Sequence, residues 1–461
     1  MRNPEFQRQL WLNWRPSLIF WSLGLTALVL AAATTLGSDV RRAGTLGVSA
    51  FAGLWLAACV YGSVLASRSL AEEARQNTWD WQRLSALSPW QMAWGKLLGS
   101  ALPAWLYALW FALVLLFVSA TFVIEGGRYG LHTVLLAVLW GLALQSWAMN
   151  SVLIGWGQRG AAGRRQMAWL PLLALLFLLP VPVLRPLLRS LFSGSDETRS
   201  WWGLDLGNLG MSYVFGAVLL GLGLLALWRQ LCARLDMRTL PWAWPLGLAI
   251  CGLAAGGLSA APLAATLAYI SLFALTGTAY IALATAHEGL RSWRQVQWSA
   301  SQGQWRAMLQ AVPLWPVSWL LALAATLLLL LPGATPAGPA LPVPANLALM
   351  LNWQLLRDAL LLTGFSLLAG RLKSPVAVFA ICWITINGLL PMIAAGLLGS
   401  ASLAATQPTL ALLLRGGEPA LRPALPWGSA LAQLLLVAGW VALLFRRHVL
   451  GFARESQPTQ M

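Results

Sequence analysis

Charged side chains that could do chemistry are few in this chain of 461 residues, which has 14 acidic residues and three histidines. Asp358, beside Arg357, is the acidic residue that falls within a long apolar stretch. We place this pair about six residues inside the outer end of a membrane helix that begins near Asn352. Adjacent residues on a helix do not face each other, so we expect each to seek another partner, or Arg357 to extend toward the membrane surface. Arg357 and Asp358 are a candidate intramembrane polar site.

Three kinds of chemistry find little support. An ion-coupled carrier usually places several carboxylates near the middle of the membrane, and this chain offers Asp358. A membrane enzyme acting on lipid-linked sugars needs carboxylates on its first outer loop, where Asp39 stands alone. The four cysteines have no metal-binding spacing. We therefore expect no catalytic or metal site and no enzyme, and keep the lipid-linked-sugar enzyme and the ion-coupled carrier as alternatives.

A short polar segment between two long apolar stretches holds the other candidate residues. It begins at Glu72-Glu73 and ends at Gly95-Lys96, and Ser88-Pro89 lies between them. Proline ends a preceding helix, so the spacing predicts a short helix over 78–87. Such a helix would present Trp79 and Leu84 to an apolar groove of a partner protein.

This segment resembles the one after the second membrane helix in exporter-type (type 2) ATP-binding-cassette permeases. The family shows a Glu-rich turn, a Gly-Thr before a Leu-rich helix, a Ser/Thr-Pro, and a Gly-Lys that opens the third span. Asn77 replaces the usual Gly here, which leaves the turn geometry open. The resemblance assigns these residues to coupling with the ATPase: Glu72, Glu73, Thr78, Trp79, Leu84, Pro89, Gly95 and Lys96, with Glu288 in the corresponding second-half loop. An amphipathic loop of some other transporter is the alternative interpretation.

The resemblance implies a permease subunit that exports a lipophilic or lipid-linked substrate across a bacterial cytoplasmic (inner) membrane. No Gly-x-x-x-x-Gly-Lys-Ser/Thr phosphate loop occurs in the chain. ATP would therefore be bound by a separate nucleotide-binding subunit, expected in two copies, and this chain would need no cofactor of its own. Membrane lipids are the other expected partners.

The elements that position these residues are membrane helices. The chain is 59% hydrophobic and 10% charged, a composition that predicts an all-α polytopic membrane protein. Apolar runs predict about twelve spans. A basic stretch, Arg229 to Arg238, divides them into two six-helix permease halves, residues 1–238 and 239–461. A run over 239–286 should form two spans that turn near Gly256, Gly257 and Pro262.

The net charge of +16 concerns topology rather than nucleic acid, for which we expect no binding. With both termini in the cytoplasm, most Lys and Arg residues fall in the inner segments, as the positive-inside rule requires. The opening residues, 4–15, have Phe6 and Leu10 at helical spacing and Trp11 and Trp14 as membrane-surface anchors. They are consistent with a helix lying in the membrane interface or with an ordinary basic flank of the first span.

Overall fold

The computed structural model describes most of the chain. The described residues are 3–35, 39–76, 82, 87–122, 126–158, 199–235, 237, 239–259, 261–286, 289–331, 345–368, 374–398, 402, 406 and 424–450. By its internal contacts the chain divides into two compact units, unit 1 (Met1–Arg238) and unit 2 (Thr239–Met461). The division falls at the residue expected from the sequence, while the assignment of each unit as a six-span permease half stays a prediction.

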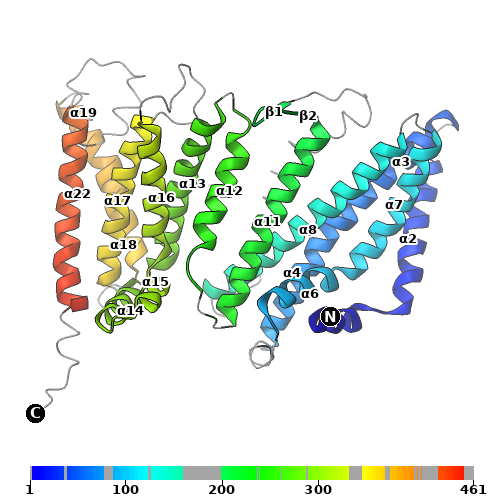
Figure 1. Ribbon diagram of the computed structural model, residues 1–461, viewed down its shortest axis with the longest axis horizontal. Helices are drawn as coiled ribbons and strands as arrows, with labels where there is room; N and C mark the ends of the chain where they lie inside the picture. Colours follow the sequence, from blue (N-terminus) through cyan, green and yellow to red (C-terminus); the bar gives the residue numbers. More distant parts are fainter. Residues whose placement is uncertain are drawn as a thin grey trace, which may run out of the picture. The chain divides into compact units, whose positions relative to one another are not determined.

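Helices make up almost all of the described part of unit 1 (Figure 1). Residues 199–206 add a two-stranded antiparallel hairpin. The elements are α1 (Pro4–Asn13), α2 (Pro16–Thr35), α3 (Asp39–Trp55), the π-helical segment η1 (Leu56–Tyr61), α4 (Gly62–Arg75), α6 (Pro89–Ser100), α7 (Leu102–Phe122), α8 (Gly126–Gln158), β1 (Arg199–Trp201), β2 (Leu204–Leu206) and α11 (Asn208–Arg234).

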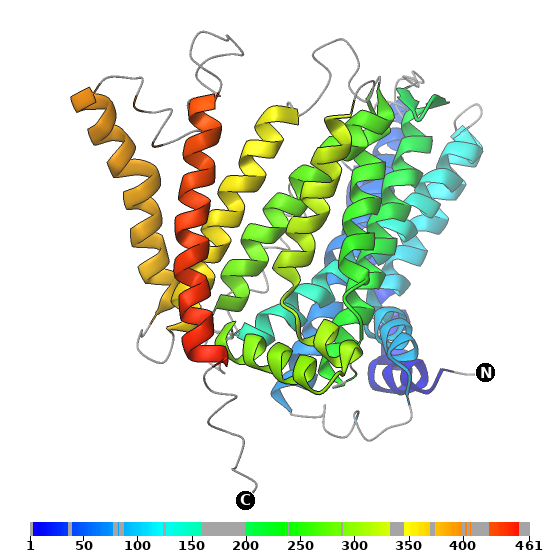
Figure 2. The same ribbon diagram turned by 60° about the vertical axis from the view of Figure 1, so that its left-hand side comes forward.

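Unit 2 is helical throughout its described part, and Figure 2 shows its C-terminal helices in a second view. Its elements are α12 (Ala243–Gly256), α13 (Pro262–Thr285), α14 (Gly289–Ser301), α15 (Trp305–Ala311), α16 (Leu314–Leu329), α17 (Ala345–Leu367), α18 (Pro375–Ile384), the π-helical η3 (Thr385–Leu389), α19 (Leu390–Leu398), α22 (Ala424–Phe445) and the π-helical η5 (Arg446–Leu450).

The protein is an all-α polytopic membrane protein. Seven helices in the described part of the chain are long and apolar enough to cross a membrane, or nine if two bent pairs each count as one span. One bend, of 66°, separates α1 from α2 at Pro16, and the other, of 88°, separates α15 from α16 next to Pro313. An apolar run over 166–184, one of the twelve expected spans, lies outside the described residues, and the count of twelve stays a prediction.

Proline and glycine set several helix boundaries where the sequence predicts them. The helix α12 ends at Gly256 and α13 begins at Pro262, so the run over 239–286 does form two helices. Pro89 occupies the first turn of α6, where a missing N–H removes no helical hydrogen bond. These breaks fix where the flanking polar segments leave the apolar helices.

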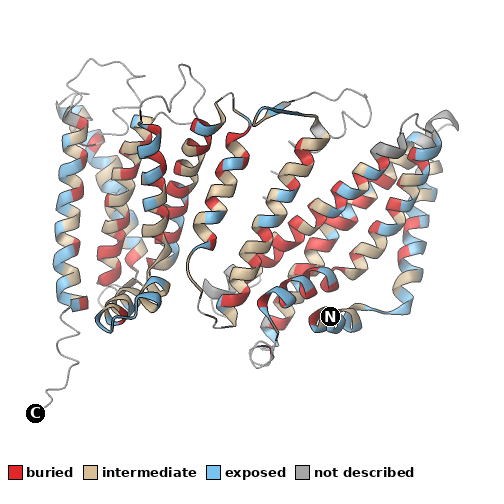
Figure 3. Cartoon of the chain, in the orientation of Figure 1, coloured by how far each residue is buried: buried red, intermediate tan, exposed pale blue. Residues whose placement is uncertain are grey.

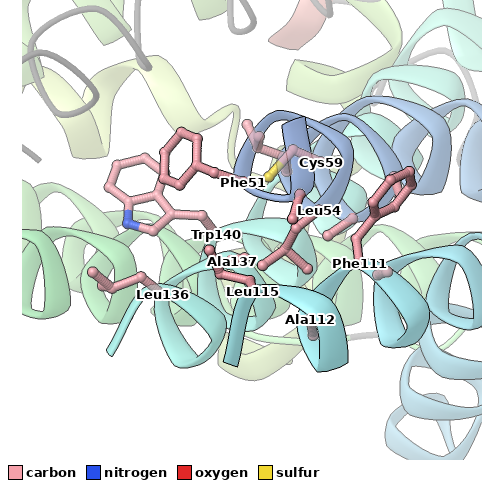
Figure 4. Close-up of a cluster of buried hydrophobic side chains, with 14 residues drawn as sticks. Phe51, Leu54, Cys59, Phe111, Ala112, Leu115, Leu136, Ala137 and Trp140 are labelled. Carbon is pink, nitrogen blue, oxygen red and sulfur yellow. The ribbon is translucent and has the colours of Figure 1, made fainter. Parts of the chain in front are cut away.

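The core of each unit consists of apolar side chains between the long helices. In unit 1, Figure 4 shows Phe51, Leu54, Phe111, Leu136 and Trp140 gathered from α3, α7 and α8. In unit 2, α13 packs along α16, where Ala274 and Ala322 are fully buried. Figure 3 shows buried residues along α13 and mostly exposed or intermediate ones along α22. Exposed apolar surface on α22 is expected of a helix that faces lipid.

Candidate functional site

The end of α4 and the helix α6 hold the five predicted coupling residues that the structure describes. Glu73 lies in the last turn of α4, and Gly95 and Lys96 lie on α6. Ser88 caps α6: its hydroxyl accepts from the Gln91 N–H at 3.2 Å, and the Gln91 side chain accepts from the Ser88 N–H at 3.1 Å. This capping box satisfies two backbone groups and fixes the start of α6, and thereby the direction of Lys96.

Lys96 connects two carboxylates from different helices. Its side chain is 2% exposed, and its Nζ lies 3.1 Å from Glu5 Oε1 and within hydrogen-bonding distance of Glu73 Oε2. Glu5 belongs to α1 and Glu73 to α4. One ammonium group therefore joins α1, α4 and α6.

A second cation binds the same two carboxylates. Arg8 donates from Nε to Glu5 Oε2 at 2.9 Å and from Nη2 to Glu5 Oε1 at 2.7 Å, and it also donates to Glu73 Oε1. Gln9 Nε2 donates to Glu5 and to Glu73, both at 3.1 Å, and Gln82 Nε2 donates to Glu73 at 3.2 Å. We call these six residues the Lys96 cluster: Glu5, Arg8, Gln9, Glu73, Gln82 and Lys96.

The charges of the Lys96 cluster balance, with two carboxylates against two cations. Burial raises the pKa of the Glu5 carboxyl, but hydrogen bonds from Arg8 and Gln9 and the charge of Lys96 outweigh it, so the pKa lies below its ordinary value. The hydrogen bond to Glu5 likewise raises the pKa of Arg8. Buried ions are stable only when paired and hydrogen-bonded, so each member of the cluster depends on the others.

Two glycines allow α1 to lie directly on α6. A Cβ added at Gly95 would lie 2.7 Å from the Phe6 backbone nitrogen, and one added at Gly99 would lie 2.4 Å from Gln9 Cβ. These distances are too short for any side chain larger than hydrogen. Gly95 thus permits the close approach that brings Glu5 to Lys96.

The helix α1 buries its polar face. Glu5 and Gln9 are buried, whereas Trp11 is 85% exposed and Leu12 is also exposed. Asn3 caps the helix, accepting from the Glu5 N–H at 3.0 Å. Figure 1 shows α1 lying across the end of unit 1 at which α4 ends and α6 begins. Residues 4–15 were expected to form either an interfacial helix or an ordinary basic flank of the first span. A helix with polar contacts to protein and outward-facing apolar residues fits the interfacial helix better.

The other predicted coupling residues lie outside the Lys96 cluster. Glu72 is partly exposed and interacts within α4, with Arg75 and with Gln76 Nε2 at 2.8 Å. Pro89 begins α6 and is buried. Thr78, Trp79, Leu84 and Glu288 lie outside the described residues, as does most of the predicted helix over 78–87.

The contribution of α1 to the Lys96 cluster was not predicted from the sequence. Glu5, Arg8 and Gln9 form half of the Lys96 cluster, although they are far from Lys96 in the sequence. Their spacing of three and four residues places them on one face of a helix, which is the signal that could have identified them. The sequence places Glu5, Arg8 and Gln9 off the apolar stripe of residues 4–15, but their place in the Lys96 cluster was not predicted.

Arg357 and Asp358 form an ion pair that helix geometry did not predict, and each also has a further partner, as expected. Arg357 Nε and Nη2 donate to Asp358 Oδ1 at 2.9 and 2.6 Å. Adjacent side chains leave a helix in different directions, but the Arg357 side chain is long enough to bend back to Asp358. Arg357 does not extend outward, because its side chain is 5% exposed.

Three further helical segments complete this second group. Arg357 donates to Asn387 Oδ1 at 2.7 Å and to the Gln433 side chain. Gln354 Nε2 donates to Asn387 Oδ1 at 3.2 Å, and Trp383 Nε1 donates to Asp358 Oδ2 at 2.9 Å. We call these six residues the Arg357 cluster: Gln354, Arg357, Asp358, Trp383, Asn387 and Gln433.

The Arg357 cluster lies at the middle of its helices, not about six residues from an end as expected. Arg357 follows the first residue of α17 by twelve residues and precedes the last by ten. Asn387 is at a similar position between Pro375 and Leu398, and Gln433 lies nine residues into α22. The prediction was wrong because α17 begins at Ala345, seven residues before Asn352. An apolar run shows where a helix can lie but not where it begins.

A search for metal-binding residues and comparisons with known proteins give no further information on these two clusters. Within the described ranges, no group of three or more His, Cys, Asp or Glu residues could hold a metal ion. Comparisons of the chain with protein-family models, with curated proteins and with solved structures found no match.

Proposed function

We propose that this protein is the membrane permease of an ATP-binding-cassette exporter, which moves a lipophilic or lipid-linked substrate using a separate ATPase subunit. The observation that carries the proposal is the Lys96 cluster. Glu73, Gly95 and Lys96 belong to the motif that resembles the family, and they meet at one buried point that also holds α1.

The cluster supports a mechanical role for this point. A partner that pushes on the segment between α4 and α6 acts on Glu73 at one end and on Lys96 at the other. Because Lys96 binds Glu5 and Arg8 binds Glu73, α1 moves with both helices. The helix α6 is followed at once by the span α7, so a displacement at the cluster reaches a membrane helix through a short, capped element.

The proposal includes the finer topology. Twelve spans in two six-span halves and both termini in the cytoplasm are expected from the apolar runs and the distribution of Lys and Arg. A bacterial inner membrane is what the family resemblance implies. Two ATPase subunits per chain match two halves. The coupling surface then lies between α4 and α6 in unit 1 and near α14 in unit 2.

An ion-coupled carrier is the second candidate, favoured by the position of Asp358 at the middle of α17. A carboxylate that binds and releases an ion must be able to exchange its positive partner. Asp358 already has the Arg357 guanidinium, held by Asn387 and Gln433. This permanent partner makes ion coupling the weaker candidate.

Purification of the tagged protein from its host in a gentle detergent tests the proposed function. Mass spectrometry should identify a nucleotide-binding subunit at about two copies per chain, the stoichiometry expected of a fused permease. If no ATPase accompanies the chain, even after cross-linking, the proposal is wrong. Deletion of the transporter's ATPase should also abolish export, whereas an ion-coupled carrier would lose export on collapse of the ion gradient.

A further inference from the structure

The Arg357 cluster places an ion pair at the middle of α17, a helix that the sequence predicts to cross the membrane. Ionisable residues are costly there, and they usually mark a substrate or ion pathway. Three helical elements contribute to the cluster: α17, the segment from α18 to η3, and α22. Asn387 belongs to η3, and π-helical turns inside a helix are frequent at functional sites.

We propose that the Arg357 cluster binds the uncharged, hydroxyl-rich headgroup of a lipid-like molecule. We take this molecule to be the transported substrate, and that identification alone rests on the proposed function. The cluster contains one cation and one anion in direct contact, so it offers no net charge to a charged headgroup. It does offer three amide side chains, a carboxylate, a guanidinium and an indole N–H within one network. Hydroxyl groups both donate and accept, and so they can exchange hydrogen bonds with each of these groups.

The side from which a ligand would enter is the surface of α18. Trp383 is 44% exposed, and its indole donates to Asp358. Asp358 is more exposed than Arg357, at 13% against 5% of the side chain. Ile381 and Ile384, on the same helix, are also exposed. A molecule with its chains among these apolar residues would bring its headgroup to Trp383 and Asp358 first.

A second polar group in unit 2 shows what a purely structural network looks like. Ser271, Thr326 and Asn352 join α13, α16 and α17 by hydrogen bonds of 2.8 and 3.0 Å. All three side chains are uncharged and buried. The Arg357 cluster differs in its ion pair and in its exposed indole, and neither is needed to hold three helices together.

Photolabelling of the purified full-length chain in phosphatidylcholine nanodiscs tests this inference. The probe is an alkyl β-glucoside with a diazirine next to the sugar. We expect label on peptides of α17 and α18, with competition by dodecyl maltoside but not by dodecylphosphocholine or dodecyl phosphate. Competition by dodecyl phosphate alone would overturn the inference in favour of an anionic headgroup.

Two variants and one control sharpen the test. Trp383→Phe and Asp358→Asn should each reduce the glucoside label at least about tenfold, since hydrogen bonds to charged groups are lost. Trp305→Phe changes a tryptophan that is also exposed, on α15, and should leave the label unchanged. Trp383→Phe removes one N–H, so it remains informative if Asp358→Asn fails to fold.

Equal labelling of the wild type and Trp383→Phe would overturn the inference. The experiment needs no ATP and no partner subunit. A chain that co-purifies with an ATPase but shows no competed label therefore retains the proposed function and loses this headgroup site. A chain that labels as expected but has no ATPase keeps the site and loses the proposed function.

Discussion

The Lys96 cluster and the Arg357 cluster both hold buried charged side chains, but at different positions along their helices. Each balances its charges within the protein, with two carboxylates and two cations in the first and one of each in the second. The first lies where α4 ends and α6 begins, next to a helix outside the spans. The second lies at the middle of α17. The position along the helices, rather than the residue types, separates a joint between helices from a candidate binding site.

In each unit, a π-helical segment inside a long helix accepts a hydrogen bond from a polar side chain of another helix. In unit 1, Gln145 Nε2 donates to the Ala58 carbonyl of η1 at 2.9 Å. In unit 2, the Asn387 side chain on η3 accepts from Arg357 and Gln354. The first contact is neutral and fully buried, as a structural contact would be, whereas the second joins an ion pair. This difference agrees with the headgroup site proposed for unit 2.

The largest effect is expected at Lys96. Lys96→Met would leave Glu5 and Glu73 with one cation between them. Loss of one partner of a buried ion pair costs about 3–5 kcal/mol. The melting temperature in detergent should fall strongly, and the double variant Lys96→Met with Glu5→Gln, which restores the charge balance, should recover part of the loss. A double variant no more stable than the single one would show that charge balance does not hold this joint together.

Asp358→Asn should have the next largest effect on stability. The substitution keeps the shape of the side chain but leaves the Arg357 charge without its carboxylate. An unpaired Arg at the centre of a membrane helix costs about 2.5–3.5 kcal/mol. The melting temperature in detergent measures the change, and Arg357→Gln combined with Asp358→Asn should be more stable than Asp358→Asn alone. If the single and the double variant have the same melting temperature, Arg357 and Asp358 are not electrostatically coupled.

Gly95→Ala should weaken the contact of α1 with α6. The added methyl group would meet the Phe6 backbone at 2.7 Å, and overpacking of this kind costs about 1–3 kcal/mol. Gly24→Ala is the matched control, because a Cβ on that α2 residue meets nothing within 4 Å. The control should be neutral or stabilising, since Ala favours helix over Gly. Equal melting temperatures for both variants would contradict the close packing described for α1.

The smallest effect is a pH dependence at Glu5. Its pKa in the folded protein lies below the ordinary 4.5, so its contribution to stability is complete above that value. The contribution is lost as the pH falls through the lowered pKa, because the carboxylate then binds a proton. Melting curves below pH 4.5 should decline more steeply for the wild type than for Glu5→Gln. Parallel curves would show that Glu5 does not titrate in this way.

The sequence predicted helices and their breaks better than it predicted polar contacts. Gly256, Pro262 and Pro89 act through local backbone geometry, which a sequence shows directly. The meeting of Glu5 with Lys96 depends on how α1 packs on α6, which is tertiary. Glu73, Gly95 and Lys96 were identified as a set from their motif, but nothing in that motif predicts that Glu73 and Lys96 are in contact. The direct contact between Arg357 and Asp358 was not predicted, because helix geometry alone leaves out the length of the Arg side chain.

The coupling role of Glu73 is the central claim, and a comparison of Glu73→Gln with Glu72→Gln tests it most directly. The two residues are adjacent on α4, but Glu73 binds Arg8 and Lys96 whereas Glu72 contacts its own helix. The measurement is substrate export and ATP hydrolysis by the complex with its ATPase, reconstituted in vesicles. We predict that Glu73→Gln keeps the ATPase bound but exports substrate poorly for each ATP hydrolysed, and that Glu72→Gln behaves almost as the wild type. Equal coupling in all three proteins would contradict the account.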